Sequence, residues 1–300
     1  MHMGCIAAIP ETSQTADIEY NRLCKHTKQL LSPVKFMNTD KSCFYTDLKG
    51  GLWKLRRHNN QKENLELYYN NMRAFLLPTS DYILKPASVH KLTKRAFAIR
   101  MEFGGIDLFD AMQHSFSLKT VTGALRDVAE AIHWLHRHSL AHRDIKPENV
   151  VCHHGRYKLI DFDFCSPLED FTHCGTEGFM CPPDGTKHWP GTPSDHSRRA
   201  DVYAFGKTIL MVLWKASSEG FLKRRRVIWL MFHKAYVAKI PMTIEPEWQP
   251  WLDIAMACCA KIPPTTIPTL PATMEDTVGT VDSGTAATTI QVVDADPGFA

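Results

Sequence analysis

The sequence predicts an α+β protein with two unequal lobes, and three observations lead to this prediction. Between residues 30 and 105 the apolar residues come in short bursts, which are typical of strands. One amphipathic helix interrupts these bursts, and longer helical periodicities follow them. We therefore expect a small β-rich N-lobe with one helix over about 31–102, and a larger α-helical C-lobe over about 106–270.

The N-lobe is expected to contain an antiparallel sheet and a single helix. Apolar bursts predict strands at 34–37, 43–45, 52–55 and 97–101. A Lys-Gly-Gly turn at 49–51 predicts a hairpin between the second and third of these strands. The helix is indicated by apolar residues at i, i+4, i+7 and i+11, followed by a proline: Leu65, Tyr69, Met72, Leu76 and Pro78. We expect this apolar line to be its buried face.

The C-lobe is expected to be built on two long helices. The first runs from about 118 to 138 and is amphipathic, with Leu125, Val128 and Ile132 on one face. The second runs from about 201 to 215. A glycine-containing segment at 102–105 marks the expected boundary between the lobes.

The two ends of the chain differ from the body in composition. Residues 1–30 lack a sustained periodicity and are expected to form a flexible arm. Residues 271–300 hold five of the 32 acidic residues and none of the 35 Lys and Arg, so residues 1–270 carry a net charge of +8. This Thr-rich acidic tail is expected to be disordered.

Composition excludes several classes of protein. Hydrophobic residues make up 44% and charged residues 22%, and the net charge is only +3, so neither global disorder nor a nucleic-acid or membrane partner is indicated. The basic run at 223–226 adjoins an apolar run and indicates a solvated loop rather than sequence-specific nucleic-acid binding. No stretch approaches about 18 apolar residues, the length of a membrane span. Nine cysteines without a Cys-x-x-Cys pair, and no signal peptide, predict an intracellular protein of the cytoplasm or nucleus.

The strongest functional signal is a pair of motifs after the first long helix. His-Arg-Asp-Ile-Lys-Pro-Glu-Asn occupies 142–149, and Asp-Phe-Asp occupies 161–163 at the end of a strand. These motifs resemble the catalytic loop and the metal-binding motif of eukaryotic-type Ser/Thr protein kinases. Two further segments, 175–183 and 201–206, resemble the end of the activation segment and the start of the helix beneath it in the same order.

The resemblance implies a bilobal protein kinase-like fold over 31–270 and the transfer of the γ-phosphate of Mg-ATP to Ser/Thr hydroxyls of protein substrates. Lys146 and the Gly175-Thr176 pair favour Ser/Thr over Tyr. The compact helical lobe suggests a viral kinase, for example of a herpesvirus, acting in the host cell. The oligomeric state is left open.

The resemblance also implies roles for individual residues. Asp144 orients the attacking hydroxyl and Lys146 steadies the γ-phosphate. Asn149 and Asp161 hold Mg²⁺, because their oxygen atoms suit a hard cation. Lys54, on the expected third strand, binds the α- and β-phosphates of ATP.

The remaining nucleotide-site residues surround these groups. Glu66 is expected to form the ion pair with Lys54, since it lies closer than Glu63 to the apolar face of the N-lobe helix. The expected hinge for adenine is Met101, Glu102 and Phe103. Asp107 is expected to meet the ribose hydroxyls, or else simply to begin a helix, and Val151 is expected to form the floor of the adenine pocket.

Several positions depart from the family pattern. No glycine-rich loop precedes the second strand, and Leu52 replaces the small residue expected above adenine. Asp163 replaces the glycine of the metal-binding motif, and Pro183 and Ile267 replace an ion pair of the helical lobe. Two alternatives therefore stay open beside the active kinase: a pseudokinase or scaffold with little turnover, and a basic interaction module that needs no nucleotide.

Overall fold

We describe a computed structural model of the chain. It describes residues 12–28, 31–34, 42–112, 117–216 and 246–271. The chain divides into two units, Met1–Leu270 and Pro271–Ala300, and the description that follows concerns the first. The expected turn before the second strand, the basic run at 223–226 and nearly all of the acidic tail lie outside the described residues. Within the described ranges, no helix is both long and apolar enough to cross a bilayer.

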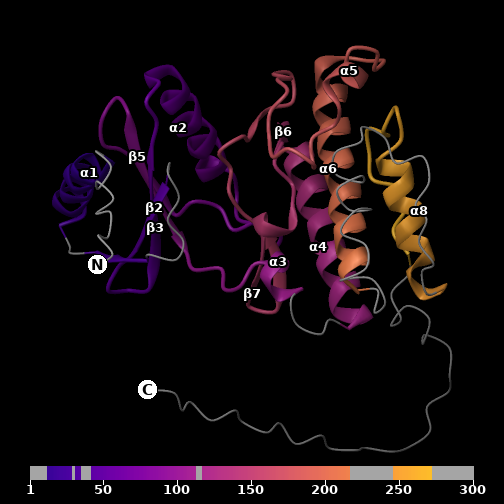
Figure 1. The fold of residues 1–300 in the computed structure, drawn as a ribbon, viewed down its shortest axis with the longest axis horizontal. Helices are drawn as coiled ribbons and strands as arrows, with labels where there is room; N and C mark the ends of the chain where they lie inside the picture. The colour runs from indigo at the N-terminus through magenta and orange to yellow at the C-terminus, as the bar shows by residue number, and fades with distance from the viewer. Residues whose placement is uncertain (1–11, 29–30, 35–41, 113–116, 217–245, 272–300) are drawn as a thin grey trace, which may run out of the picture. The chain divides into compact units, whose positions relative to one another are not determined.

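The N-lobe contains a five-stranded antiparallel sheet in the order β1-β2-β3-β5-β4. Its elements are β1 (Ser32–Pro33), β2 (Ser42–Thr46), β3 (Gly51–Arg57), β4 (Ser88–Lys91), β5 (Ala96–Glu102) and the helices α1 (Thr12–Thr27) and α2 (Gln61–Leu76). The strands expected at 43–45, 52–55 and 97–101 fall within β2, β3 and β5. Figure 1 shows the sheet between α1 and α2.

Helix α1 corrects the flexible arm expected over residues 1–30. Leu23 of this helix is fully buried in one cluster with Leu31 and Trp53, on the sheet face opposite α2. The Tyr20 hydroxyl donates a 2.7 Å hydrogen bond to the carbonyl of Leu31. The helix therefore covers a face of the sheet whose apolar residues would otherwise meet water. Tyr20 and Leu23, one turn apart, are the sequence signal for this face.

Helix α2 lies where expected but is rotated relative to the prediction. Of the predicted apolar face, Tyr69 is 50% exposed and Leu76 is 73% exposed. The buried face instead contains Leu67 together with two asparagines, Asn70 and Asn71. The asparagines are buried because their amides have hydrogen-bond partners in another segment, 161–163.

The C-lobe is helical around α4 and α6. Its elements are α3 (Leu108–Ala111), α4 (Leu118–Arg137), β6 (Leu140–Ala141), η2 (Pro147–Asn149), β7 (Val150–His153), β8 (Arg156–Leu159), β9 (Ser166–Pro167), α5 (Pro183–Thr186), α6 (Pro193–Ala216), η3 (Pro246–Trp248) and α8 (Gln249–Cys258). Figure 1 shows α4, α6 and α8 side by side, and their buried faces form one apolar core. The α+β fold class predicted from the sequence is confirmed.

Helix α6 begins about two turns earlier than expected. The backbone N–H of Thr192 donates to the Asp195 carboxylate at 2.8 Å, and the Asp195 N–H donates back to the Thr192 hydroxyl at 3.3 Å. This reciprocal pair satisfies free donors of the first turn. The extra turns place Asp201 inside the helix rather than at its first residue.

In the C-lobe, a buried apolar residue stands at one of the two positions where the family pattern has an ion pair. Ile267 is buried in the C-lobe core, at 7% exposure. The segment that carries it is held by the indole N–H of Trp189, which donates to the carbonyl of Lys261 at 3.0 Å, and by Arg199, which donates to the carbonyl of Pro263. No unpaired charge is buried at positions 183 and 267, since both charged groups are replaced together.

Candidate active site

The loop after β6 is fixed from below by Asp201. The carboxylate of this fully buried residue accepts hydrogen bonds from the backbone N–H groups of His142 at 2.9 Å and Arg143 at 2.7 Å, and it contacts His136 Nε2 at 2.9 Å. Burial alone would raise the pKa of Asp201, but His136 and the backbone donors keep it below its ordinary value. Asp201 thus holds the loop backbone as a charged acceptor.

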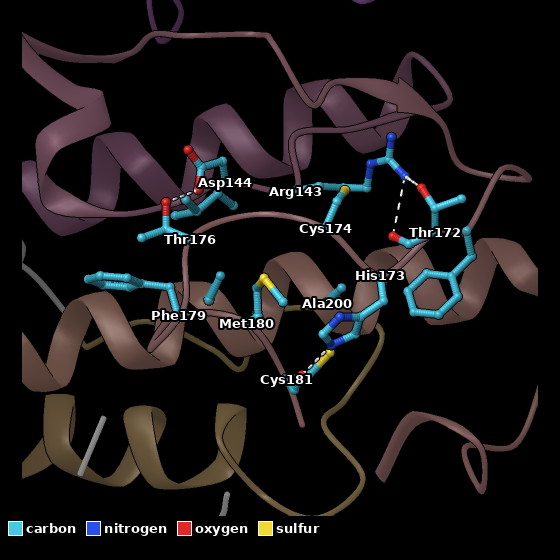
Figure 2. Close-up of a pocket in the computed structure, with 13 residues that line it drawn as sticks. Arg143, Asp144, Thr172, His173, Cys174, Thr176, Phe179, Met180, Cys181 and Ala200 are labelled. Atoms are coloured by element: carbon cyan, nitrogen blue, oxygen red, sulfur yellow. Dashed lines mark hydrogen bonds between the residues drawn. The ribbon is translucent and has the colours of Figure 1, made fainter. Parts of the chain in front are cut away.

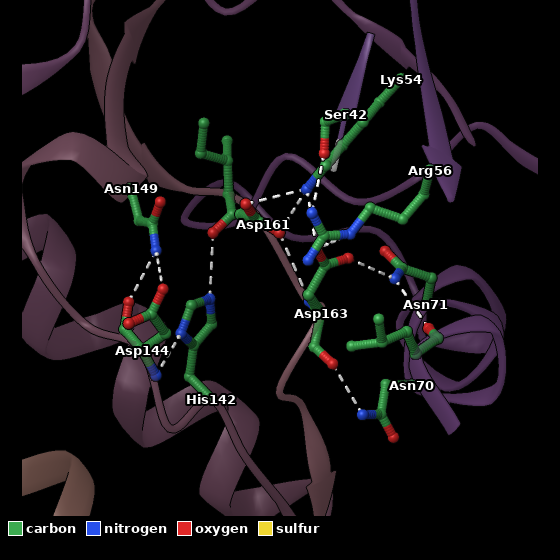
Figure 3. Close-up of polar contacts among 12 residues, drawn as sticks. Ser42, Lys54, Arg56, Asn70, Asn71, His142, Asp144, Asn149, Asp161 and Asp163 are labelled. Carbon is green, nitrogen blue, oxygen red and sulfur yellow. Dashed lines mark hydrogen bonds and ion pairs between the residues drawn. The ribbon is translucent and has the colours of Figure 1, made fainter. Parts of the chain in front are cut away.

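The imidazole of His142 connects the two motifs. Its Nδ1 accepts the backbone N–H of Asp144 at 3.3 Å, so its Nε2 is the donor to the carbonyl of Ile160, 3.0 Å away. Its ring also meets that of Phe162 edge to face, with centroids 5.3 Å apart. One side chain therefore sets the distance between the 142–149 loop and the 161–163 segment, as Figure 3 shows.

Asp144 is surrounded by donors. The Asn149 amide nitrogen donates to its carbonyl oxygen at 2.7 Å and to its Oδ2 at 2.9 Å, and Lys146 Nζ lies 2.9 Å from the same Oδ2. The Thr176 hydroxyl donates to Oδ1 at 2.6 Å and accepts from Lys146 at 2.6 Å. Burial would raise the pKa of Asp144, but Lys146 and Thr176 bring it below its ordinary value. The carboxylate is therefore ionised and fixed in direction.

Lys54 reaches from β3 to the 161–163 segment. Its Nζ lies 2.9 Å from both carboxylate oxygens of Asp161 and 3.0 Å from Oδ2 of Asp163. Burial would lower the pKa of Lys54, but Asp161 and Asp163 raise it above its ordinary value. Asp161 has a φ of 63°, in the left-handed region that non-glycine residues seldom adopt. This unfavourable backbone conformation occurs at a residue whose carboxylate is fixed by its ion pair with Lys54.

Glu66 does not form the ion pair with Lys54 that the sequence predicted. Glu66 is not among the groups that contact Lys54, and Glu63 pairs with His58 at 2.9 Å. The prediction failed because the helix face was located from apolar residues alone. The face of α2 turned toward the 161–163 segment carries Asn70 and Asn71, which the sequence analysis missed.

The expected hinge lies at the end of β5. Met101 pairs with Leu52 in the sheet, and the Glu102 carboxylate lies 3.2 Å from His153 Nε2 on β7. Phe103 is 51% exposed. Val151, the expected floor, is buried, and a Cβ placed on Gly104 would lie 2.5 Å from its Cγ2. The backbone after the hinge therefore packs directly on Val151.

Asp107 caps a helix. Its carboxylate accepts the backbone N–H of Asp110 at 2.9 Å at the start of α3, and its backbone pairs with that of Val151. The position beside Val151 keeps it next to the expected nucleotide site. The structure thus gives Asp107 the capping role that the sequence offered as one of two possibilities.

A pocket lies beside Asp144 on the activation-segment side. Its lining includes Thr176, Phe179, Met180 and Cys181, and Figure 2 shows them around the cavity. Gly175, at φ 124°, is required here because a Cβ would lie 2.4 Å from the carbonyl oxygen of Arg143. The pocket is next to the carboxylate expected to orient the acceptor hydroxyl.

Arg143 holds the activation segment in place. Its guanidinium donates to the carbonyls of Phe164 at 2.7 Å and Asp170 at 3.2 Å, and to the hydroxyl of Thr172. His173 Nε2 lies 2.6 Å from the carbonyl of Cys181, as Figure 2 shows. Arg143 thus orders the segment mainly through the segment's backbone carbonyls.

The residues expected to hold Mg²⁺ suit a hard cation. The amide nitrogen of Asn149 is engaged by Asp144, and its amide oxygen points away from that carboxylate in Figure 3. Asp161 supplies a second oxygen donor, and Lys54 beside it supplies positive charge for a phosphate. Amide and carboxylate oxygens flanked by a lysine fit a Mg-nucleotide.

Parts of this chain are similar in sequence to known protein kinases. MAP kinase-interacting serine/threonine-protein kinase 2 of Xenopus laevis is 31% identical over 114 residues, which are 33% of this chain and 24% of the relative. The phosphorylase b kinase gamma catalytic chain, liver/testis isoform, of Mus musculus is 30% identical over 149 residues, which are 47% of this chain and 36% of the relative. Developmentally-regulated protein kinase 1 of Dictyostelium discoideum is 25% identical over 193 residues, 60% of this chain and 26% of the relative. The matched parts thus span between 24% and 36% of these relatives.

The family comparison covers most of the chain. The family model described as the protein kinase domain matches residues 53–262, which begin in β3 and end after α8. The match includes Lys54, the 142–149 loop and the 161–163 segment, whose side chains meet in the site described above. The chain belongs to the protein kinase domain family.

Proposed function

We propose that this protein is an active Ser/Thr protein kinase that transfers the γ-phosphate of Mg-ATP to protein hydroxyls. The observation that supports this most is the environment of Asp144, which is an ionised carboxylate directed by Asn149, Lys146 and Thr176. A carboxylate placed in this way can accept the proton of a serine or threonine hydroxyl and align it for attack.

Each residue of the site then has a defined task. Asp144 orients the acceptor hydroxyl, and Lys146, 2.9 Å from it, stabilises charge on the transferred phosphate. Lys54 holds the α- and β-phosphates. Asn149 and Asp161 provide oxygen ligands to Mg²⁺, which when bound would neutralise phosphate charge. Positioning and charge stabilisation account for the catalysis.

Thr176 supports Ser/Thr specificity. Its hydroxyl lies between Lys146 and Asp144, and the Gly175-Thr176 pair is a sequence feature that favours Ser/Thr over Tyr. The pocket formed by Phe179 and Met180 next to it suits an apolar neighbour of the acceptor. Protein substrates and an intracellular location, in the cytoplasm or nucleus, belong to the same proposal. The viral source stays a prediction from the sequence alone.

Phosphate transfer tests the proposal directly. Wild type is compared with Asp144→Asn and Asp161→Ala, using radiolabelled ATP, Mg²⁺ and generic protein substrates. Asp253→Asn, at an exposed site on α8, is the matched control. We expect a loss of about a hundredfold or more for the two site variants and none for the control. If wild type labels substrates no better than Asp161→Ala, the protein is not an active kinase.

A pseudokinase is the second candidate, and one observation favours it. Leu52 is buried on β3, two residues before Lys54 and on the same side of the strand, where the family prefers a smaller residue above adenine. A thermal-shift measurement with Mg-ATP separates the two candidates from a protein without a nucleotide site. Binding without transfer identifies the pseudokinase.

A further inference from the structure

Asp163 lies at the centre of a buried polar cluster. This residue is 3% exposed. Its Oδ2 lies 3.0 Å from Lys54 Nζ and 3.1 Å from Arg56 Nε, and its Oδ1 accepts the amide N–H of Asn71 at 2.9 Å. Its carbonyl oxygen accepts the amide N–H of Asn70 at 2.7 Å. Figure 3 shows β3, α2 and the 161–163 segment meeting at this one residue.

The cluster contains the anion that α2 does not provide. Among the described residues, the acids within ion-pair distance of Lys54 are Asp161 and Asp163, both from the same segment. The helix contributes two neutral amides, Asn70 and Asn71, to this cluster, and Glu66, the partner implied by the family resemblance, is not part of it. The negative charge has therefore moved from the helix to the position after Phe162.

Charge balance gives Asp163 a role distinct from that of Asp161. Lys54 and Arg56 bring two cations into a buried region, which need two anions nearby. Asp161 is the proposed Mg²⁺ ligand, so its carboxylate is shared with the metal when nucleotide binds. Asp163 keeps its contacts with Lys54, Arg56 and Asn71 independently of that metal, because its carboxylate is directed toward α2 and β3.

We propose that Asp163 is the fixed ion-pair partner of Lys54, and that Asn70 and Asn71 hold it against α2. Asp163 is then a positioning residue: it acts on the nucleotide through Lys54. The inference rests on the proposed function only in naming what Lys54 binds. It also explains how the segment accommodates an aspartate at a position where the family has glycine, since all of its polar atoms named above have partners.

The test transfers the carboxylate from position 163 to helix α2. Asp163→Gly removes the carboxylate and restores the family residue, and Asn71→Glu introduces a carboxylate on α2 next to the place that the Asp163 carboxylate leaves. The variants are each single substitution, the double variant, and Asp163→Asn, which keeps the side-chain volume. Glu66→Gln is the matched control on α2, since Glu66 does not contact Lys54. Mg-ATP affinity by calorimetry, kcat and KM for ATP, and unfolding by urea are measured for each.

We expect Asp163→Gly and Asp163→Asn to weaken Mg-ATP binding by about tenfold and to lower kcat/KM by roughly a hundredfold. Asn71→Glu alone should also be impaired, because its carboxylate would face that of Asp163. The double variant should recover most of the loss, to within about threefold of wild type. Recovery beyond Asp163→Gly comes from the carboxylate introduced at position 71, because no carboxylate at position 163 is left in that background to repel it.

Three outcomes would overturn the proposal. The first is a double variant that folds yet binds no better than Asp163→Gly. The second is an Asp163→Gly variant that behaves like the Glu66→Gln control. The third is a loss in Asp163→Gly that excess Mg²⁺ restores, since this would make Asp163 a metal ligand.

The test is separable from the proposed function. If wild type binds nucleotide without transferring phosphate, the kinase proposal fails and the affinities still decide the role of Asp163. If no nucleotide binds, the coupling between positions 71 and 163 is read from urea unfolding. A double variant more stable than Asp163→Gly then supports the ion pair, and a double variant no more stable than Asp163→Gly overturns it.

Discussion

The Thr176 hydroxyl donates a 2.6 Å hydrogen bond to the carboxylate of Asp144. The two residues belong to different segments, the end of the activation segment and the loop after β6. Because the same hydroxyl accepts from Lys146 at 2.6 Å, it links both charged groups of the loop to the activation segment. This link keeps the pocket lined by Thr176 and Phe179 next to the Asp144 carboxylate.

Removing this hydroxyl should impair catalysis more than stability. We expect Thr176→Ala to lower kcat by about tenfold, because Asp144 and Lys146 lose their common partner and their alignment with it. Thr176→Ser keeps the hydroxyl and should stay within about threefold of wild type. Phosphate transfer at saturating ATP measures both variants, and equal activities for the two would contradict the role given to the hydroxyl.

Asp201→Asn should destabilise the C-lobe. The two backbone N–H groups of His142 and Arg143 bond to different carboxylate oxygens, so an amide in either orientation turns its own NH₂ toward one of them. An unsatisfied buried donor costs about 1–3 kcal/mol. We expect a loss of that size in the free energy of unfolding, measured with urea.

The control for this prediction is the exposed Asp253→Asn on α8, which should change the unfolding free energy by no more than about 0.5 kcal/mol. If the two variants unfold at the same urea concentration, the bonds to His142 and Arg143 contribute nothing measurable.

Local sequence patterns predicted the positions of the helices and strands better than they predicted which face of each is buried. The 142–149 motif and β3 were placed correctly because both depend on short stretches of sequence. The buried side of α2 was not, since the amides of Asn70 and Asn71 find partners outside the helix at Asp163, about 90 residues away in the chain. A rule that locates a buried face from apolar residues selects Tyr69 and Leu76, which are exposed.

The Lys54 partner was missed for the same reason. Asp163 was recognised as a departure from the family pattern, but nothing near it in the sequence indicates which cation it meets. Helix α1 differs, because the spacing of Tyr20 and Leu23 is itself a local signal of an apolar face. Its partner, the outer face of the sheet at Trp53, could be known only once the strands were paired.

Acid should weaken the N-lobe through Asp47. This buried carboxylate accepts Arg100 Nε at 2.7 Å, Trp53 Nε1 at 3.0 Å and the backbone N–H of Gly51 at 2.8 Å. Burial would raise the pKa of Asp47, but Arg100 and the other donors lower it to about 2 from an ordinary value of 3.8. A pKa lowered by folding stabilises the protein above the unfolded value and ceases to do so as pH falls through the folded value.

The stabilisation from Asp47 amounts to about 2 kcal/mol in total. It is complete above about pH 4 and is lost as the pH falls from about 4 to about 2. We expect the difference in unfolding free energy between wild type and Asp47→Asn to shrink by this amount over that window. Urea titrations at a series of pH values measure it. A difference that is independent of pH would show that Asp47 has an ordinary pKa in the folded protein.

Two glycines inside helices should respond to alanine in opposite directions. A Cβ on Gly206 of α6 would lie 2.6 Å from Cys258 Cβ and 2.8 Å from Cys259 Sγ. The backbone of α6 therefore packs directly against these two cysteines at the end of α8. On Gly123 of α4, a Cβ would meet nothing within 4 Å. Alanine favours a helix over glycine by about 1 kcal/mol at either site, but overpacking costs about 1–3 kcal/mol at Gly206 alone.

We therefore expect Gly123→Ala to raise the free energy of unfolding by about 0.5–1 kcal/mol, and Gly206→Ala to lower it, with α8 displaced from α6. Chemical denaturation followed by circular dichroism measures both. Because the two substitutions are chemically the same, any difference between them reports the surroundings of the helix and not its propensity. A Gly206→Ala variant as stable as Gly123→Ala would mean that α6 and α8 are farther apart in solution than the contact with Cys258 requires.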